Sequence, residues 1–504
     1  MFDIIIVFMF EEEILQPVMA NLERFSERNA FCIENKFYTY NDFSNAIKKI
    51  RGLLQFREIR GRNVGLVTNN DLETYASIFA LWLEGYSYVP LHINQPVDRC
   101  YNIIEQVGIT TILDSSKHSR YKQSMLINTN EKEHVNSDFT IRRHITDSDL
   151  AYILFTSGST GIPKGVTISR GNIAAFINSF WATGIQINEN DRCLQCFDLT
   201  FDVSVQCYLS ALIKGACVFT VPYMEGKYLY VAGLMEEYGL SFAVMAPSML
   251  RYMQPFFEQI DMTKLKSCIL TAEACPKKLL ECIYTYNSQI QLFDFYGPTE
   301  ATVYCTCYKL SNTGLNKDLN GIISIGKALK NVSSIILRED GTECKCNEKG
   351  ELCVAGLQIT PGYWNNIEKN SSSFFEYELD GRLMRFYKTG DLCYMDEYGD
   401  IMYSGRIDNQ VKIQGYRIEL GEIEFQAREF LPNKNVVCLA KEINDIVTLF
   451  LVIEGEEFAT QELVSYLNSK LPSYMIPTHI LFIKEFPLNS SDKVDRKKMK
   501  LIIN

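Results

Sequence analysis

The sequence is poor in the patterns that mark metal-binding, repeat and low-complexity proteins. It contains only five histidines among 504 residues. Its one Cys-x-x-Cys spacing, from Cys193 to Cys196, has no second pair. Because zinc sites of this kind need four ligands, we interpret both cysteines as structural and predict no metal site there. No internal repeat or low-complexity block is visible, which argues against a solenoid or a disordered chain.

No stretch has the pattern of a signal peptide or a membrane span. Met1–Phe10 is apolar but lacks the basic leading region and small-residue cleavage site of a secretory signal. The run is half of the roughly 20 apolar residues that cross a bilayer, so we expect it to begin a strand, a helix or an irregular segment. We interpret the 16 scattered cysteines as reduced thiols. These features predict a cytoplasmic protein.

Positive charge is also scarce. Fifty Lys and Arg face 61 Asp and Glu, which gives a net charge of −11. Nucleic acids and anionic membranes are polyanions, so we expect no nucleic-acid partner and no membrane insertion. The 47% of hydrophobic and 22% of charged residues are typical of a globular protein. The length accommodates two or more cores, and we expect a monomer.

Strand-like and helix-like segments alternate through roughly the first 300 residues. Apolar β-branched runs such as Asn63–Thr68 and Ser87–Leu91 stand on either side of a helical Tyr75–Leu83. Such alternation predicts α/β architecture. After about Ile322, short strands and glycine turns predict a β-rich part.

A tight junction at Gly405–Asp408 precedes a last unit of about a hundred residues. We expect helices around Glu422–Phe430 and Gln461–Leu471, between short strands, as in a small α+β domain. The sequence therefore predicts a large α/β domain over residues 1–407 and a small α+β domain over residues 408–504.

The segment Phe155–Val166 has the composition of a phosphate-binding loop. It follows an apolar strand and contains three glycines, four hydroxyl residues within Thr156–Thr160, and Lys164. Glycines let backbone N–H groups turn towards an anion, hydroxyls add donors, and lysine adds charge. The order is not that of a P-loop, because Pro163 stands where a glycine would precede the lysine. We predict phosphate binding rather than a plain surface turn.

This loop and the motifs after it resemble the adenylate-forming superfamily. That superfamily includes acyl-CoA synthetases, luciferases and the adenylation domains of peptide synthetases. The similar segments appear in the family's order: Thr156–Gly165, Tyr296–Glu300, Tyr387–Asp391, Gly405–Asp408, Lys412–Glu422, Leu471–Pro477 and Lys493–Arg496. The resemblance runs from about Tyr40 to Arg496. It implies ATP and Mg²⁺ as cofactors, a large α/β domain with a distorted β-barrel part, and a small mobile C-terminal domain.

The resemblance also implies a role for individual residues toward the nucleotide. Glu300 would bind Mg²⁺ as a hard oxygen ligand, and Thr299 would contact the α-phosphate. Asp391 would accept hydrogen bonds from both ribose hydroxyls, assisted by Arg406. Tyr296 would stack on adenine, with Glu273 and Gly297 in the same site. The β- and γ-phosphates would be held by Thr156, Ser157, Gly158, Ser159, Thr160 and Lys164.

Lys493 would bridge the substrate carboxylate and the transferring phosphate, where charge is redistributed in the transition state. The usual Asn-Gly before this lysine is replaced by Ser491 and Asp492, which also suit a turn. The resemblance thus implies a catalytic set of Thr156, Lys164, Glu300 and Lys493.

Two further residues would serve the change between half-reactions. Asp408 would be the hinge about which the small domain rotates, since a hinge needs a few residues that absorb a large backbone change. Gly415 would serve the second, thiol-dependent half-reaction.

Asp202 implies that the substrate is an amino acid. In amino-acid-activating members an aspartate at this place pairs with the α-ammonium group, and a substrate without that group would leave the aspartate unpaired. The alternative is a helix N-cap aspartate. By motif, the rest of the pocket would be Val203, Gln206, Val244, Leu270, Ala272, Phe295, Val303 and Tyr304.

This pocket is mostly apolar and has no side chain placed to pair with a charged substrate group, so a small, uncharged amino acid is expected. The chain resembles freestanding D-alanine ligases that load an alanyl carrier protein. Asp202, Val203, Gln206 and Ala272 also resemble pockets that select proline, and the two interpretations stay open.

The acceptor is expected to be a separate carrier protein. The chain ends eight residues after Arg496, whereas a fused carrier would need about eighty residues with a phosphopantetheine-bearing serine. The alternatives are an acyl-CoA synthetase that uses free coenzyme A, which Asp202 disfavours, and a catalytically silent nucleotide-binding protein. The presence of Lys164, Glu300, Asp391 and Lys493 argues against the silent protein.

Overall fold

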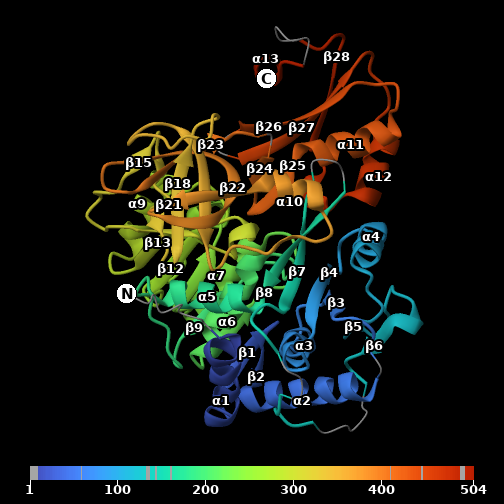
Figure 1. Cartoon of the computed structure of the whole chain (residues 1–504), viewed down its shortest axis with the longest axis vertical. Helices are drawn as coiled ribbons and strands as arrows, with labels where there is room; N and C mark the ends of the chain where they lie inside the picture. The colour runs from blue at the N-terminus through green and yellow to red at the C-terminus, as the bar shows by residue number, and fades with distance from the viewer. Residues whose placement is uncertain are drawn as a thin grey trace. The chain divides into compact units, whose positions relative to one another are not determined.

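A computed structural model describes residues 9–57, 59–131, 137–141, 145–158, 162–408, 410–443, 446–487 and 494–503 (Figure 1). The chain divides into two compact units. Unit 1 comprises Met1–Ile93, Val107–Leu154 and Gly165–Ile407. Unit 2 comprises Asn94–Gln106, Phe155–Lys164 and Asp408–Asn504. Two short segments, one of them most of the predicted phosphate loop, thus belong with the C-terminal residues.

A seven-stranded sheet forms one layer of unit 1, in the order β20-β8-β7-β4-β3-β5-β6. β3 pairs with β4 and with β5 in parallel, and β4 pairs with β7 in parallel. All six residues of β4 are buried, as expected for a parallel strand covered on both faces. The strands are β3 (Asn63–Thr68), β4 (Ser87–His92), β5 (Ile112–Asp114), β6 (Leu126–Asn128), β7 (Leu150–Thr156), β8 (Lys164–Ser169) and β20 (Gly362–Tyr363).

A nine-stranded sheet forms another layer, in the order β17-β14-β13-β12-β11-β9-β10-β1-β2. The run from β13 to β1 is parallel, and antiparallel strands close both edges. The strands are β1 (Asn29–Ile33), β2 (Lys36–Thr39), β9 (Arg192–Gln195), β10 (Cys217–Thr220), β11 (Phe242–Met245), β12 (Ser267–Thr271), β13 (Gln291–Tyr296), β14 (Thr306–Lys309) and β17 (Lys327–Ala328). Parallel strands joined by helices confirm the predicted α/β fold.

The helices of unit 1 follow amphipathic or apolar stretches. α2 begins at a capping box, in which Thr39 and Asp42 satisfy each other's backbone N–H groups. α3 packs against β3 and β4, and α6 packs against β9 and β10. The helices are α1 (Gln16–Arg24), α2 (Tyr40–Phe56), α3 (Leu72–Leu83), α5 (Arg170–Trp181), α6 (Asp202–Ile213), α7 (Lys227–Tyr238), α8 (Pro247–Met253), α9 (Lys277–Tyr286) and α10 (Ile367–Ser373).

The chain after Ile322 is rich in short antiparallel strands, as its glycine turns predict. A five-stranded sheet has the order β18-β19-β22-β21, with β23 also paired to β22. A two-stranded ribbon, β15-β16, forms a separate sheet, and its β15 contacts β23. The strands are β15 (Asp318–Leu319), β16 (Ile322–Ile323), β18 (Val332–Leu337), β19 (Gly350–Gly356), β21 (Phe374–Leu379), β22 (Arg382–Met395) and β23 (Ile401–Arg406).

Unit 2 has its own small α+β core. Buried apolar residues of α11, α12 and the sheet β26-β27-β28 pack together, among them Ile423, Leu451 and Leu467. A hairpin, β24-β25, precedes them. The elements are α4 (Val97–Val107), β24 (Gln410–Ile413), β25 (Tyr416–Glu419), α11 (Leu420–Phe430), β26 (Val436–Ile443), β27 (Ile446–Glu454), α12 (Gln461–Lys470), β28 (His479–Ile483) and α13 (Arg496–Ile502).

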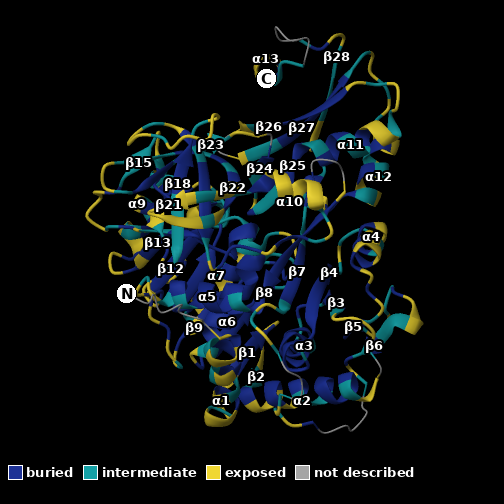
Figure 2. Cartoon of the chain, viewed as in Figure 1, coloured by how far each residue is buried: buried dark blue, intermediate teal, exposed yellow. Residues whose placement is uncertain are grey.

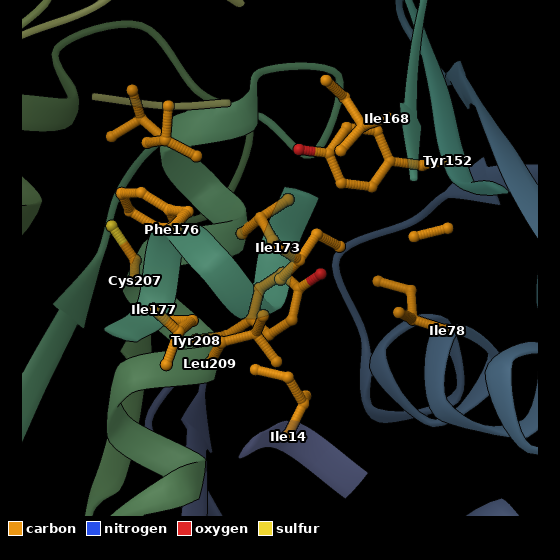
Figure 3. Close-up of a cluster of buried hydrophobic side chains, with 14 of the residues drawn as sticks. Ile14, Ile78, Tyr152, Ile168, Ile173, Phe176, Ile177, Cys207, Tyr208 and Leu209 are labelled. Atoms are coloured by element: carbon orange, nitrogen blue, oxygen red, sulfur yellow. The ribbon is translucent and has the colours of Figure 1, made fainter. Parts of the chain in front are cut away.

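The largest core lies in unit 1, where α5 and α6 meet. Ile173, Phe176 and Ile177 of α5 lie beside Cys207 and Tyr208 of α6 (Figure 3). The dark blue strands and helix faces in Figure 2 show how continuously the elements of this unit are buried. This packed layer carries the beginning of α6, where Asp202 stands.

The sequence predicts no membrane span and no metal site at Cys193 and Cys196, and both predictions can be compared with the residues that the structure describes. Over these residues, no helix combines the length and apolarity that a membrane crossing requires. The same part of the chain has no group of three or more His, Cys, Asp or Glu arranged to hold a metal ion. Cys193 and Cys196 are both buried, free thiols.

Replacing Ile173 with alanine should test the core. Ile173 is 0% exposed and is part of the cluster in Figure 3. We expect the free energy of unfolding of unit 1 to fall by about 2–5 kcal/mol, because a buried cavity is left behind. Urea titration followed by tryptophan fluorescence measures this. The control is Leu315→Ala, whose side chain is 85% exposed and whose loss should change stability by under about 0.5 kcal/mol. Equal effects would contradict this description of the core.

Candidate active site

Most of the predicted pocket residues of unit 1 lie near the ends of parallel strands. β11, β12 and β13 run side by side in parallel, so their carboxyl ends meet at one edge of the sheet. The chain then turns through Tyr296 and Gly297 into a short 3₁₀ turn, η4 (Thr299–Ala301). A Cβ at Gly297 would lie 2.5 Å from the Tyr304 Cα, so only glycine permits this close approach. The edge of a parallel sheet is where α/β folds place their ligands.

Asp202 is a buried carboxylate beside this edge. It is the first residue of α6, whose N-cap is Phe201, so the alternative that Asp202 is itself the N-cap does not hold. Its Oδ2 accepts no hydrogen bond from the residues that the structure describes. Burial raises the pKa of Asp202 to about 6; the Thr299 hydroxyl opposes this and the Glu300 charge adds to it. A buried carboxylate oxygen without a donor suits a cationic group of a ligand.

Aromatic and aliphatic side chains surround the same region. The rings of Phe295 and Tyr304 pack with centroids 4.9 Å apart, and Phe176 of α5 lies 5.8 Å from Tyr304. Val203 and Val244 belong to the same buried cluster, and so do Phe295, Val303 and Tyr304.

The predicted wall residue Leu270 lies elsewhere. Side chains alternate between the two faces of β12, and Leu270 packs into a second cluster with Met245 and Leu194. Its neighbour Ile269 packs with Val244, on the pocket side. Thr271 shares the parity of Ile269 within the strand, and its hydroxyl lowers the raised pKa of Tyr304. Leu270 and Ile269 thus face opposite sides of β12, and the part of Leu270 in the substrate pocket stays a prediction.

Two other predicted wall residues are Ala272 and Gln206. Ala272 follows β12 with a φ of +71°, a backbone conformation uncommon for alanine. Gln206 is fully buried on α6, and its amide donates to the Ser210 Oγ at 3.1 Å. Gln206 thus presents a polar group that is already hydrogen-bonded within its own helix.

Glu300 is completely buried. Its Oε1 accepts a hydrogen bond from the Tyr363 hydroxyl at 2.7 Å, and its backbone oxygen accepts one from the Thr360 N–H at 2.9 Å. A fixed carboxylate is a hard ligand of the type that Mg²⁺ takes together with substrate phosphates. Glu300 therefore fits the predicted metal role, in which phosphate and water would supply the remaining ligands.

Asp391 lies in a second group of polar residues. Its Oδ1 accepts a hydrogen bond from Arg406 at 3.0 Å, and its Oδ2 accepts one from the Tyr296 hydroxyl. Each carboxylate oxygen can accept a second bond, so the predicted contacts to two ribose hydroxyls remain chemically feasible. Asp391 on β22 and Arg406 on β23 are directly paired in the sheet, which brings these side chains together.

Glu273 interacts with the start of α8. Its two carboxylate oxygens accept hydrogen bonds from the Ser248 N–H at 2.8 Å and the Ser248 hydroxyl at 3.0 Å. Its predicted part in nucleotide binding stays a prediction.

The predicted phosphate loop, in unit 2, already holds anions. The Gly158 N–H donates to Glu422 at 3.2 Å, and Lys164 pairs with Glu419 at 3.7 Å. The Ser157 hydroxyl donates to the Arg417 carbonyl at 3.0 Å. Lys164 and the Gly158 N–H, which we expect to hold phosphate, therefore bind carboxylates here.

Several predicted residues have little or no description in the structure. Ser159, Thr160 and Lys493 lie outside the described residues. Thr156 ends β7, and its hydroxyl is buried without a partner among the described residues. Gly415 has a φ of +81° in the turn between β24 and β25, and unit 2 resumes at Asp408. The roles of Asp408 as a hinge and Gly415 in the thiol half-reaction stay predictions.

Residues 18–364 match the family described as AMP-binding enzyme. The chain belongs to this family. Its members use ATP, which agrees with the nucleotide roles predicted from the motifs. The candidate-site residues of unit 1 lie within the matched part, except Asp391 and Arg406, which follow it.

Curated relatives of the family extend the similarity over almost the whole chain. The chain is 30% identical over 487 residues to a linear gramicidin synthase of Brevibacillus parabrevis, covering 95% of this chain and 9% of that protein. It is 28% identical to the D-alanine–D-alanyl carrier protein ligase of Bacillus licheniformis, covering 94% of this chain and 95% of that protein. The chain thus spans only a small part of some relatives and nearly all of others.

A solved structure has the same fold. The adenylation domain AlmE of Vibrio cholerae, in complex with glycyl-adenosine-5'-phosphate, aligns with a TM-score of 0.85 at 22% identity, covering 97% of both chains. At this identity the similarity shows the fold, a large α/β part followed by a small C-terminal part, in agreement with the fold predicted from the sequence.

Replacing Asp202 with asparagine should stabilise the ligand-free protein at neutral pH. Because the folded pKa, about 6, lies above the ordinary 3.8, the folded state holds this proton more tightly than the unfolded state does. The contribution of this bound proton to the free energy of unfolding is fully present below pH 4 and is lost as pH rises through 6. We therefore expect the free energy of unfolding of Asp202→Asn to exceed that of the wild type by about 3 kcal/mol near pH 7.5 and by much less at pH 4.

Thermal unfolding between pH 4 and 8, without nucleotide or amino acid, measures this difference. Glu397→Gln is the control, because Glu397 is exposed and its removal should leave the pH profile unchanged. A wild-type advantage at pH 7.5 would show that Asp202 has a stabilising partner inside the protein.

Proposed function

We propose that this chain is an AMP-forming ligase that activates a small, uncharged amino acid as an aminoacyl-adenylate. It then passes the aminoacyl group to the phosphopantetheine thiol of a separate carrier protein, forming a carbon–sulfur bond. D-alanine is the first candidate substrate. The relative of matching length named as a D-alanine–D-alanyl carrier protein ligase supports both parts of the proposal.

The observation that carries the proposal is the state of Asp202. Its Oδ2 is buried without a donor among the described residues, and burial raises its pKa to about 6. An α-ammonium group would supply the missing positive charge and hydrogen-bond donors. A fatty or aryl acid would leave a buried charge unpaired, which costs several kcal/mol.

The other residues of the candidate site would bind the nucleotide and stabilise the transition state. Adenylate formation joins the substrate carboxylate to the α-phosphate of ATP, and pyrophosphate leaves. Glu300, fixed by Tyr363, would hold Mg²⁺, and Asp391 would orient the ribose. Lys164 and the N–H groups of the phosphate loop would neutralise the leaving pyrophosphate, and Lys493 would stabilise the charge that develops as the carboxylate attacks.

The substrate is proposed to be small because large rings fill the pocket. Phe295 and Tyr304 are in contact and buried, at 1% and 0% exposure. L-proline is the second candidate substrate, since four pocket residues resemble those of pockets that select proline: Asp202, Val203, Gln206 and Ala272. The cytoplasmic location and monomeric state stay predictions.

Amino-acid-dependent exchange of pyrophosphate into ATP tests the first half-reaction. We expect exchange with one or a few small amino acids from a panel of the twenty proteinogenic amino acids and D-alanine. Propionate and acetate serve as matched acids without an amine. Asp202→Asn should lower kcat/KM for the amino acid by about 100-fold or more, through loss of the ion pair, and leave the trace rate with propionate unchanged.

Two results would contradict the proposal. The absence of exchange with every amino acid tested would contradict the proposed first half-reaction. Exchange with simple carboxylic acids only, followed by thioester formation on free coenzyme A, would favour the acyl-CoA synthetase alternative.

Lys493→Ala should slow adenylate formation by about 100-fold, because a charge that stabilises the transition state is removed. Trapping of the adenylate with hydroxylamine measures the rate. Lys500→Ala is the matched control, an exposed lysine of α13 in the same basic tail, and should keep the wild-type rate. An unchanged rate in Lys493→Ala would show that this lysine has no part in the first half-reaction.

A further inference from the structure

The turn that carries two of the proposed pocket residues has an unfavourable backbone. Thr302 and Val303 have φ values of +52° and +70°. β-branched residues rarely adopt this left-handed region, because their side chains clash with the backbone there. The next residue is Tyr304, so the strain lies immediately beside the proposed substrate pocket. Strain of this kind persists only where surrounding structure holds it.

Gln358 supplies that support from more than fifty residues away in the sequence. Its Nε2 donates to the Ala301 carbonyl at 2.8 Å and also to the Tyr304 carbonyl. The amide thus spans the two ends of the strained turn. In return, the Thr302 hydroxyl donates to the Gln358 backbone oxygen at 2.5 Å.

These contacts fix the orientation of the amide. Gln358 is 1% exposed, and its Oε1 accepts no hydrogen bond from the described residues. A reversed amide would place an oxygen against two carbonyl oxygens, so only the observed orientation satisfies the turn. Two backbone carbonyls that are satisfied by one buried side chain depend strongly on it.

We propose that Gln358 is a positioning residue for the amino-acid pocket, which it shapes by holding Val303 and Tyr304 in place. The proposal rests on the proposed function, because it takes these two residues as part of the substrate pocket. Both hydrogens of the Gln358 amide are donated to the turn, so neither is left for Glu300 or Asp391. Its influence should therefore fall on the amino acid and spare the nucleotide.

The first variant is Gln358→Met, which keeps the length of the side chain and removes the amide. We expect KM for the amino acid in pyrophosphate exchange to rise about 10-fold, with KM for ATP within twofold of the wild type. Thr302→Val, which removes the reciprocal hydrogen bond, should act in the same direction. The double variant should show less than the product of the two effects, because both act on one turn.

The matched control is Asn287→Leu. Asn287 is also buried, and its Nδ2 donates to two backbone carbonyls, of Met262 at 2.8 Å and Leu265 at 2.9 Å. Its loss should lower the melting temperature as much as the loss of Gln358 and leave both KM values unchanged. A shift in amino-acid KM equal to that of Gln358→Met would show that general destabilisation is the cause, and would overturn the proposal.

Amide hydrogen exchange gives a readout that needs no substrate. The peptide that covers residues 301–304 should exchange about 10-fold faster in Gln358→Met than in the wild type or in Asn287→Leu. If the wild type activates no amino acid, the proposed function fails, and the pocket role of Gln358 fails with it. If the wild type is active but Gln358→Met has the wild-type amino-acid KM and exchange rate, only the role of Gln358 is overturned.

Discussion

A carboxylate removed from water must regain donors or a cation inside the protein, or its charge becomes costly. Unit 1 buries several such groups, and three of them belong to the candidate site: Asp202, Glu300 and Asp391, at 6%, 0% and 2% exposure. Two of them have internal partners: Tyr363 donates to Glu300, while Arg406 and Tyr296 donate to Asp391. Asp202 is held less completely: burial raises its pKa to about 6, although hydrogen bonds from the Thr299 hydroxyl and the Val303 N–H lower it, and its Oδ2 has no donor among the described residues. The protein thus keeps one carboxylate in a state that a positively charged substrate would relieve.

The sheets explain why these three carboxylates can coexist. Parallel strands β11, β12 and β13 bring the pocket residues to one edge, whereas the antiparallel pair β22 and β23 fixes Asp391 beside Arg406. The loop that follows β19 connects the two parts, since Gln358, Thr360 and Tyr363 all contact the segment from Glu300 to Tyr304. A short loop therefore sets both the position of the proposed metal ligand and the shape of the proposed substrate pocket.

Much of this could be predicted from the sequence, because the informative signals are local. The strand at Asn63–Thr68, the α/β class and the ordered motifs are all readable over short windows. Leu270 shows what motif alignment leaves out: it packs in another buried cluster than Ile269, and the face on which a side chain lies depends on the strand's register. Gln358 carries no local signal, because its importance comes from a turn more than fifty residues distant.

The internal contacts of the predicted phosphate loop have a consequence for any measurement of nucleotide affinity. A backbone N–H has one hydrogen to donate, and that of Gly158 is donated to Glu422, while Lys164 pairs with Glu419. A phosphate oxygen that binds there has to displace a carboxylate of the protein's own chain. The measured binding free energy is then the difference between two terms: the free energy with which the phosphate binds these donors, and the free energy with which the protein's own carboxylate binds them. Weak apparent affinity for a nucleotide would therefore be compatible with strong contacts to its phosphates.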